Sequence, residues 1–409
     1  MLNATDAQPI PSHVPADLVR EIDVFNVKIL HEDLHLAWKR VQDENPPIFY
    51  TPLNGGHWIM TRAPMIERLF SEPELFASRH AYVPPLPPGI PEMLPINSDG
   101  EEHRAYRSFI TPFLVTKQLA AAIGRARKLA IELIEDLQDK GECDFISDFA
   151  EHLPIQIFLD MVDLPLSDRP RLLRFAEMVR INDPQEKAAR YADMMAYLDG
   201  WIEKRIDSPG EDMISKIVSG KVGDRPMTRD EMMGECIVIL LGGLDTVASM
   251  LGFIANFLAR EPEIRGRLVK DPALIPKVID ELMRRFGVAA PCRRMARDVE
   301  IDGITLKEGD VIYVGTFFHG LDQERWKDSL IVDLDRQVDN PFTFGGAKGP
   351  HRCPGAGLAR AEVTIFLEEW LKRIPDFQIK PGSQPQFGSG SVNGVYTLPL
   401  NWQVANKIA

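Results

Sequence analysis

The sequence has few cysteines and no cluster of them. Cys143, Cys236, Cys292 and Cys353 are scattered over 409 residues, and no two of them form a CxxC pair. The sequence therefore predicts neither a zinc ribbon nor a dense disulfide framework. It also lacks an excess of basic residues, because its formal net charge is −13. Nucleic-acid binding needs a basic face, so we expect no nucleic-acid partner.

The N-terminal segment lacks the basic and apolar regions of a secretory leader, and we expect a cytoplasmic protein. One run, residues 236–259, is long and apolar enough to span a bilayer. Asp245 stands near its middle, where a charge is costly in lipid, and both flanks are charged. We interpret the run as a buried helix of a soluble core, and we expect no membrane partner and a monomer.

The pattern of apolar residues is mostly helical, and strand-like runs are confined to three regions. Residues 47–62 are predicted to form a hairpin through residues 54–56, NGG. Residues 298–316 and 386–403 also alternate as strands do. No internal repeat, low-complexity tract or clean linker interrupts the chain. The sequence predicts a mainly α fold with small β regions, in a single domain over residues 1–409.

Two helices have clear predicted boundaries. Thr228 and Glu231 match the S/T-x-x-E capping box, so a long apolar helix is expected from there to Arg260. A second helix is expected from Pro276, a favoured first-turn residue, to a cap near Gly287.

Cys353 stands in a glycine-rich loop, residues 342–360, which reads FTFGGAKGPHRCPGAGLAR. Pro354 is predicted to open a helix, which would place the sulfur at a helix end where backbone N–H groups stabilise an anion. The glycines at 345, 346 and 349 would allow the backbone to come close to a flat group. This arrangement suits a thiolate ligand to heme iron, and the alternative is a buried structural cysteine.

Two further motifs lie on the predicted helices. Residues 242–246, GGLDT, place two glycines, an acid and an alcohol in an apolar helix, although each glycine costs about 1 kcal/mol there. Asp245 and Thr246 would either pass protons to a ligand held over the glycines or bond back to helix carbonyls. Glu281 and Arg284 share one helix face, which by itself indicates an exposed ion pair.

Together the three motifs resemble those of the cytochrome P-450 superfamily of heme-thiolate monooxygenases. The resemblance covers essentially the whole chain, and the runs GGLDTV, ELMRRF, EEWLKRIPDF and NGGHWI are similar to the soluble bacterial camphor-hydroxylase subgroup. One departure is clear. Phe344 lies nine residues before Cys353 where the family pattern has seven, so the loop holds two extra residues within residues 346–348.

The resemblance implies an α-rich cytochrome P-450 fold around heme b, iron protoporphyrin IX. Cys353 would be the axial iron ligand, and Asp245 and Thr246 the pair that activates oxygen. The residues that would bind the heme propionates are His103, Arg107, Arg293 and His351. A buried ion-pair cluster beside the heme would be formed by Glu281, Arg284 and Arg336.

The resemblance also implies a reaction, insertion of one oxygen atom from O2 into an unactivated C–H bond. No flavin or nicotinamide domain is predicted, so electrons would come from a separate iron–sulfur ferredoxin with its reductase. A basic spot would attract an acidic ferredoxin, and its residues would be Arg104, Arg107, Lys348 and Arg352. A heme-sensing regulatory protein, or a peroxide-driven enzyme, would have no need of the Asp245–Thr246 pair.

The positions that match the family's substrate pocket are mostly apolar. They are Tyr82, Met93, Val238, Leu241, Val288, Ala289, Ser391 and Val392. In the camphor-hydroxylating relatives a tyrosine donates a hydrogen bond to the ketone, and the matching position here is Pro91, which has no side-chain donor. We therefore predict a hydrophobic terpenoid or norisoprenoid, such as an ionone, as the substrate, and a camphor hydroxylase proper is the alternative.

Overall fold

The computed structural model describes residues 7–29, 33–85, 89–114, 116–176, 178, 183–347 and 349–404. Its α-helices are α1 Leu34–Glu44, α2 Ala63–Ser71, α3 Gly100–Ile110, α4 Thr116–Gln138, α5 His152–Met161, α6 Arg169–Ala176, α7 Pro184–Asp207, α8 Met213–Val218, α9 Arg229–Arg260, α10 Pro262–Lys270, α11 Ile275–Arg285, α12 Thr316–Leu321 and α13 Ala356–Arg373. Its strands are β1 Ile48–Thr51, β2 His57–Met60, β3 Phe76–Ala77, β4 Glu142–Asp144, β5 Lys221–Val222, β6 Arg225–Pro226, β7 Cys292–Met295, β8 Val299–Ile301, β9 Ile304–Leu306, β10 Val311–Tyr313, β11 Gln378–Ile379, β12 Gln386–Gly388, β13 Gly394–Thr397 and β14 Pro399–Asn401.

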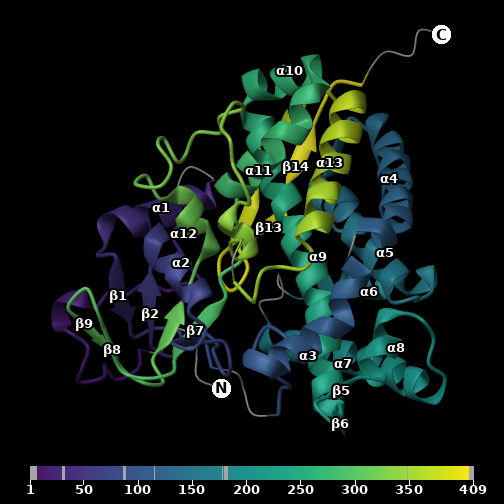
Figure 1. Ribbon diagram of the computed structural model, residues 1–409. Coiled ribbons are helices and arrows are strands. Elements are labelled where there is room, and N and C mark those ends of the chain that lie inside the picture. The colour runs from purple at the N-terminus through teal and green to yellow at the C-terminus, as the bar shows by residue number, and fades with distance from the viewer. Residues whose placement is uncertain are drawn as a thin grey trace, which may run out of the picture.

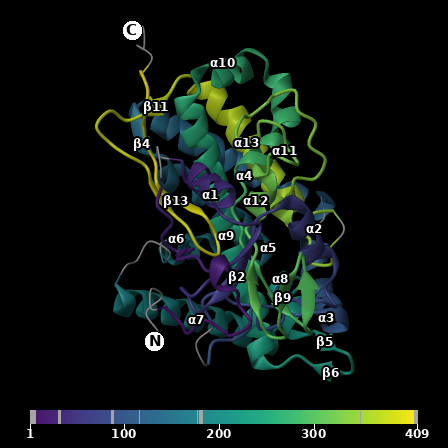
Figure 2. The ribbon, with the colours of Figure 1, turned by 90° about the vertical axis from the view of Figure 1, so that its left-hand side faces the viewer.

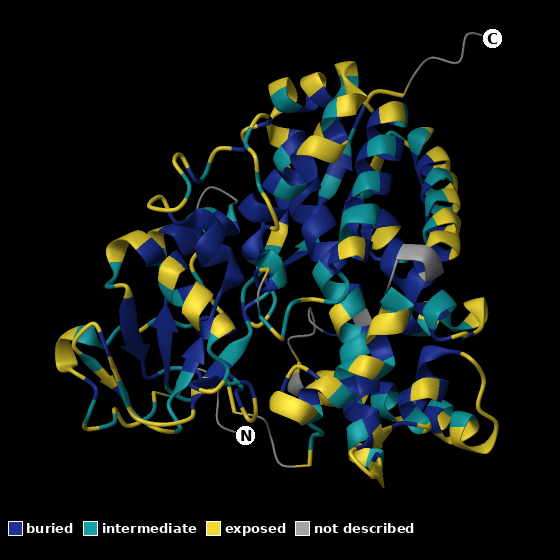
Figure 3. Ribbon diagram, in the orientation of Figure 1, coloured by how far each residue is buried: buried dark blue, intermediate teal, exposed yellow. Residues whose placement is uncertain are grey.

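A five-stranded sheet forms one side of the molecule, beside α1, α2 and α12 (Figure 1). Its strand order is β1-β2-β10-β7-β3, so strands that are far apart in the sequence lie next to each other. β1 and β2 pair antiparallel with Thr51 opposite His57, which confirms the predicted hairpin. β10 joins β2 in parallel, and both strands are buried except at Val311, in keeping with the dark blue strands of Figure 3.

The other predicted β regions form small sheets. β8 and β9 make a hairpin between β7 and β10 in the chain, and β12 pairs with β13. A three-stranded sheet of β11, β14 and β4 lies on the side of the molecule opposite α2 and α3 (Figure 2). The rest of the described chain is mainly helical, as the sequence predicts.

Helix α9 runs through the middle of the molecule (Figure 1). It begins at the predicted capping box, in which Thr228 Oγ1 accepts the Glu231 N–H at 3.3 Å and the Glu231 carboxylate accepts the Thr228 N–H at 2.7 Å. Its 32 residues correspond to a length of about 48 Å. By length and composition α9 could cross a membrane, but 61% of its most apolar window is buried within the fold. That burial agrees with its interpretation as a core helix.

Helix α13 connects the cysteine loop to the hydrophobic core. It packs against α4, α9 and α11, and its side chains Phe366 and Trp370 meet Phe145 and Phe149. The ring centroids of Trp370 lie 5.0 Å from Phe145 and 5.2 Å from Phe149, in edge-on arrangements that aromatic pairs favour. The loop that precedes α13 is therefore attached to a rigid part of the molecule.

Candidate active site

The loop that carries Cys353 is held by backbone hydrogen bonds. The N–H of Cys353 donates to the carbonyl oxygen of Phe344 at 2.9 Å, and Gly345 adopts a left-handed conformation with a φ of 82°. The helix after the cysteine begins at Ala356, with Gly355 as its N-cap, and not at Pro354 as the sequence predicted. Pro354 and Gly355 instead form a turn that brings the sulfur to the end of α13.

The sulfur of Cys353 lies among hydrogen-bond donors and positive charge. Burial raises the pKa of the Cys353 thiol, and the N–H groups of Gly355 and Ala356 and the charges of Arg107 and Arg352 act against that rise. Cys353 is exposed to solvent on one side. Protein atoms surround its sulfur on the remaining sides, which is why burial affects its pKa. Burial also raises the pKa of the Cys143, Cys236 and Cys292 thiols, and none of these three lies at a helix N-terminus.

Two of the predicted propionate residues lie side by side. The rings of His103, on α3, and His351, in the cysteine loop, have centroids 4.2 Å apart. Nε2 of His351 lies 3.0 Å from Ser78 Oγ and 3.5 Å from Asp99 Oδ1. His103 is buried, and its Nε2 has no hydrogen-bond partner among the described residues. Burial and the neighbouring charges of His351 and Arg107 lower the pKa of His103 to about 4.

Arg107 and Arg293 bring two guanidinium groups to the same region. Arg107 donates to the carbonyl oxygen of Arg352, directly before the cysteine, and Arg293 lies over the ring of Phe70 at 4.7 Å. Arg293 is buried, and its only side-chain hydrogen bond within the described chain goes to the Cys292 carbonyl oxygen at 2.8 Å. Burial lowers the pKa of Arg293 to about 10. A buried cation with spare donors is suited to an anionic group.

Ser78 and Asp99 were not among the predicted site residues. Although burial opposes it, the hydrogen bond from His351 and the N–H groups of Arg79 and Ser78 lower the pKa of Asp99 to about 2. Asp99 therefore holds the segment directly after β3 and orients His351. Its position directly before α3 was visible in the sequence, but nothing there indicated a link to a residue more than 250 positions away.

Glu281, Arg284 and Arg336 form the predicted cluster. Arg284 donates to both carboxylate oxygens of Glu281, at 2.6 Å and 2.9 Å, and both side chains are fully buried. Arg336 donates to Glu281 Oε1 at 3.0 Å, and the N–H of Asp333 donates to the same oxygen at 3.1 Å. Arg284 also donates to the carbonyl oxygen of Ser329 at 2.8 Å. The alternative of an exposed ion pair is wrong for this sequence.

Residues in the middle of α9 are accessible, whereas the residues on either side of them along the helix are buried. Within residues 238–246 seven side-chain positions are partly or fully accessible, although residues 232–237 and 247–256 on either side are buried. A Cβ added at Gly243 would meet no atom within 4 Å, and at Gly242 only Val238 at 4.0 Å. This stretch therefore borders space large enough for another group to approach the backbone.

Asp245 and Thr246 both lie on this open stretch and are half-buried. The Thr246 hydroxyl donates to the carbonyl oxygen of Gly242 at 2.7 Å, which is the bond back to the helix that the sequence left as one possibility. That bond occupies the hydroxyl proton and leaves its lone pairs free to accept.

The predicted pocket residues come together in two groups, one at each end of the open stretch. Ala289 and Val392 form a β-bridge, with the Ala290 N–H donating to Ser391 O and the Asn393 N–H to Val288 O, both at 2.8 Å. β13, which follows directly, packs on α9, where Gly394 comes close to Ser249. Val288 is buried, Ala289 and Val392 are half-buried, and Ser391 is exposed.

The second group lies at the N-terminal end of the open stretch. The N–H of Met93 donates to the hydroxyl oxygen of Tyr82 at 3.1 Å, and both residues are half-buried. A Cβ added at Gly234 would collide with the carbonyl oxygen of Glu92, so the loop that holds Met93 lies directly on α9. Val238 and Leu241 are half-buried on the helix between the two groups.

These residues fit a heme. A thiolate at a helix end suits an axial iron ligand, and the buried His103 and Arg293 offer donors that lack anionic partners in the described chain. The glycines of α9 leave room for a flat group above the helix backbone. Cys353 would hold the iron, and His103, Arg107, Arg293 and His351 are placed to bind the propionates.

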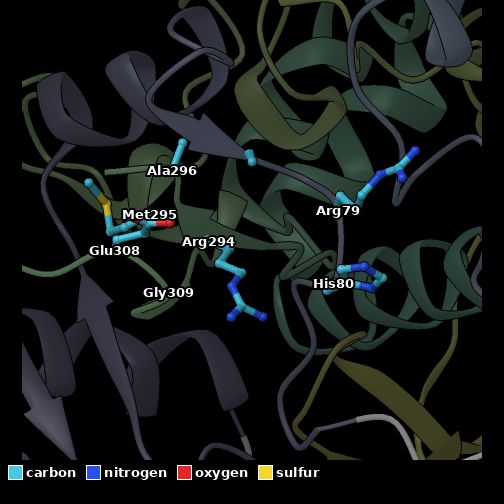
Figure 4. Close-up of a pocket in the computed structure, with 8 residues that line it drawn as sticks. Arg79, His80, Arg294, Met295, Ala296, Glu308 and Gly309 are labelled. Carbon is cyan, nitrogen blue, oxygen red and sulfur yellow. The ribbon is translucent and has the colours of Figure 1, made fainter. Parts of the chain in front are cut away.

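Other features lie outside this site. A surface pocket of about 480 Å³ beside β3 and β7 is lined by Arg79, His80 and Arg294 among others (Figure 4). None of the predicted site residues lines it, and Arg79 and His80 form ion pairs with Glu102 and Glu92.

The structure describes three of the four residues of the predicted basic spot. Arg107 and Arg352 lie beside the cysteine and Arg104 is exposed on α3, whereas Lys348 lies outside the described residues.

Comparison with known proteins agrees with this geometry. The family model described as "Cytochrome P450" matches residues 151–404. The crystal structure of cytochrome P450 CYP101C1 is 39% identical with a TM-score of 0.87, and covers 97% of this chain and 100% of that chain. The crystal structure of CYP101J2 is 36% identical with a TM-score of 0.85, over 97% of this chain and 100% of that chain.

A relative from Sinorhizobium fredii, "Probable cytochrome P450 127A1", is 32% identical over 404 residues, which is 96% of this chain and 97% of the relative. The fold and these relatives define a monooxygenase of the cytochrome P450 class. The chain belongs to the cytochrome P450 family, which confirms the fold and the family that the sequence predicted. Membership implies a heme cofactor, O2 and a redox partner.

Proposed function

We propose that this protein hydroxylates an unactivated C–H bond of a small hydrophobic substrate, a terpenoid or norisoprenoid. Heme b is the proposed cofactor, and one domain over residues 1–409 carries the activity. The open, glycine-containing stretch of α9, flanked at both ends by the apolar pocket residues, is the observation that carries this proposal. When bound, the heme supplies oxygen activation and insertion into the C–H bond.

The chain's own residues hold the heme and supply protons. The Cys353 sulfur would bind the iron, and the N–H groups of Gly355 and Ala356 would stabilise its negative charge. The Thr246 hydroxyl, which donates to the Gly242 carbonyl oxygen, would turn its proton toward the open face by rotation about the Cβ–Oγ1 bond. Asp245, the preceding residue on the same stretch, exchanges protons with it. A mainly apolar pocket excludes water from this reaction.

Electrons come, in this proposal, from a separate iron–sulfur ferredoxin with its reductase. Arg107 and Arg352 lie beside Cys353, and Arg104 on α3 is largely exposed. These cations stand on a chain whose formal net charge is −13, so an acidic ferredoxin would be steered to them. We further propose a soluble, cytoplasmic monomer, in keeping with the burial of α9 inside the fold.

The substrate class follows from the lining of the pocket. Val238, Leu241 and Val392 present aliphatic surface, and Pro91 offers no side-chain donor. Burial of apolar surface contributes about 25 cal/mol per Å², so a ring of the size of a terpenoid gains most of its affinity from contact area. An ionone-like norisoprenoid is therefore favoured over camphor.

Titration of the purified ferric protein with β-ionone and with camphor tests the substrate class. The low-spin to high-spin shift of the heme spectrum reports displacement of water by the ligand. We expect β-ionone to give a tight and near-complete shift, and camphor a weaker one. Near-complete conversion by camphor with none by β-ionone would show instead a camphor hydroxylase proper.

A further inference from the structure

Glu235 on α9 is a buried carboxyl group that the proposed chemistry does not use. Its exposed fraction is 0%, and neither carboxyl oxygen has a hydrogen-bond partner in the part of the chain that the structure describes. Burial of a polar group without a partner is unfavourable, so native structures contain few such groups. A group of this kind next to a ligand site indicates that the ligand supplies the partner.

The helical period places Glu235 on the open face of α9. Successive residues are rotated by about 100°, so Gly242, seven residues on, and Thr246, eleven residues on, each lie within about 20° of Glu235 around the helix axis. Both belong to the open stretch, residues 238–246. Leu244, which packs into the helical core, lies on the opposite face. The Glu235 side chain thus leaves the helix in the direction of the pocket.

The loop with Met93 closes the pocket at this end. Gly234 is in direct contact with the backbone of Glu92 and Leu94, so no side chain fits between α9 and the loop there. Glu235 is the next residue, one turn before Val238, and it is buried where the open stretch is accessible. Glu235 therefore lies at the closed end of the pocket. Along α9, Val238 stands between it and Gly242.

The environment of Glu235 favours the neutral acid. Burial, and secondarily the negative charge of Glu231, raises the pKa of Glu235 well above its usual range. A protonated carboxyl group carries an O–H donor, which an ionised one lacks. Glu235 can therefore donate a hydrogen bond that the proline at position 91 cannot.

We propose that Glu235 is a specificity-determining residue whose carboxylic acid donates a hydrogen bond to an oxygen acceptor, such as a ketone, on the substrate. The inference rests on the hydroxylase function proposed above. Glu235 lies about 10 Å along the helix from Gly242, so the acceptor belongs to the end of the substrate remote from the hydroxylated carbon. An apolar ring with a carbonyl group on a short side chain has this form.

The test compares two ligands in the heme-loaded protein by isothermal titration calorimetry. One is β-ionone, and the other is the hydrocarbon of the same skeleton in which a CH2 group replaces the carbonyl. Glu235→Met removes the donor at similar volume, and Glu235→Gln keeps a donor. We expect the ratio of the two dissociation constants to shift by about tenfold against the ketone in E235M and by less than about twofold in E235Q.

Glu362 provides a matched control. It lies on α13, is equally buried, and has neither oxygen hydrogen-bonded within the described chain. Glu362→Met therefore removes a buried acid on a different helix, and the ratio of the two dissociation constants should stay unchanged. An unchanged ratio in E235M, or the same shift in E362M, would overturn the role of Glu235.

A measurement on the unaltered protein keeps the inference testable if E235M does not fold. Infrared spectra of β-ionone labelled with ¹³C at the carbonyl should show the bound C=O stretch at a lower frequency than in hexane. A bound band at the hexane frequency would contradict the hydrogen bond. If neither ligand binds, the proposed substrate class is wrong, and the role of Glu235 is wrong with it. If both ligands bind normally but the reduced, CO-bound protein lacks the absorption band of a thiolate-bound heme, only the monooxygenase function is contradicted.

Discussion

The cysteine side of the site and the α9 side are built in opposite ways. On the cysteine side the loop backbone and the ion-pair cluster have their partners: the Cys353 N–H donates to Phe344, and Glu281 accepts from Arg284, Arg336 and a backbone N–H. On the α9 side seven of the positions in residues 238–246 are accessible, and two glycines border open space. The cysteine side is held in place by hydrogen bonds and ion pairs. The α9 side instead has accessible residues that border open space.

This difference corresponds to two tasks: the cysteine side is suited to holding a cofactor, and the α9 side is suited to a reaction on a substrate. A ligand that must keep one geometry needs a loop whose backbone and side chains are already satisfied. A substrate site needs room and groups able to change partner, such as the Thr246 hydroxyl. Glu281 and Glu235 differ in the same way, since Glu281 is fully paired and Glu235 has no partner in the described chain.

Breaking the cysteine side should have the largest effect on stability. Glu281→Ala leaves Arg284 buried without its carboxylate, which should lower the free energy of unfolding by about 3–5 kcal/mol. Urea unfolding followed by circular dichroism measures the change. Glu300→Ala, at an exposed position on β8, serves as the control and should change it by less than about 0.5 kcal/mol. A loss below about 1 kcal/mol for Glu281→Ala would show that the cluster is not a structural anchor.

Changes on the α9 side should affect turnover and leave stability nearly unchanged. Asp245→Asn should slow product formation by about 100-fold, because a proton carrier is lost. Thr246→Ala should keep reductant consumption but divert it to hydrogen peroxide. Both are measured by comparing reductant consumed, peroxide released and product formed.

The matched control for this pair is Ser249→Ala, a buried hydroxyl on α9 outside the open stretch. It should couple reductant to product like the parent. If Asp245→Asn and Thr246→Ala do so as well, the pair is only structural.

A smaller effect is expected at the surface of the cysteine side. Arg352→Glu should slow electron transfer from an acidic ferredoxin by about tenfold at low salt, with the difference shrinking as salt rises. Stopped-flow reduction at several ionic strengths measures it. Lys372→Glu, exposed in the last turn of α13, is the control for a change of net charge. Equal rates and equal salt dependence in both variants would exclude this surface as the docking site.

The parts of the site that the sequence predicted are those with local signals. The capping box fixed the start of α9, and the spacing of Glu281 and Arg284 placed both on one helix face. The family resemblance named Arg336, whose contact with Glu281 spans 55 residues and has no local signal.

Long-range partners could not be predicted in the same way. The contact of His351 with Ser78 and Asp99 depends on how α3 and the cysteine loop meet. Pro354 was expected to open a helix because proline favours first turns, but the turn that presents the sulfur delays the helix to Ala356. The contact of Gly234, the residue before Glu235, with Glu92 depends on a loop that reaches α9 from a distant part of the chain.

The absorption spectrum of the reduced, CO-bound protein tests the central claim most directly, which is that Cys353 holds the heme iron as a thiolate. We expect a maximum at about 450 nm for the parent protein. Cys353→His should retain heme, move the maximum to a shorter wavelength and abolish hydroxylation. A parent band at the shorter wavelength, or a band that does not move in the variant, would contradict the account.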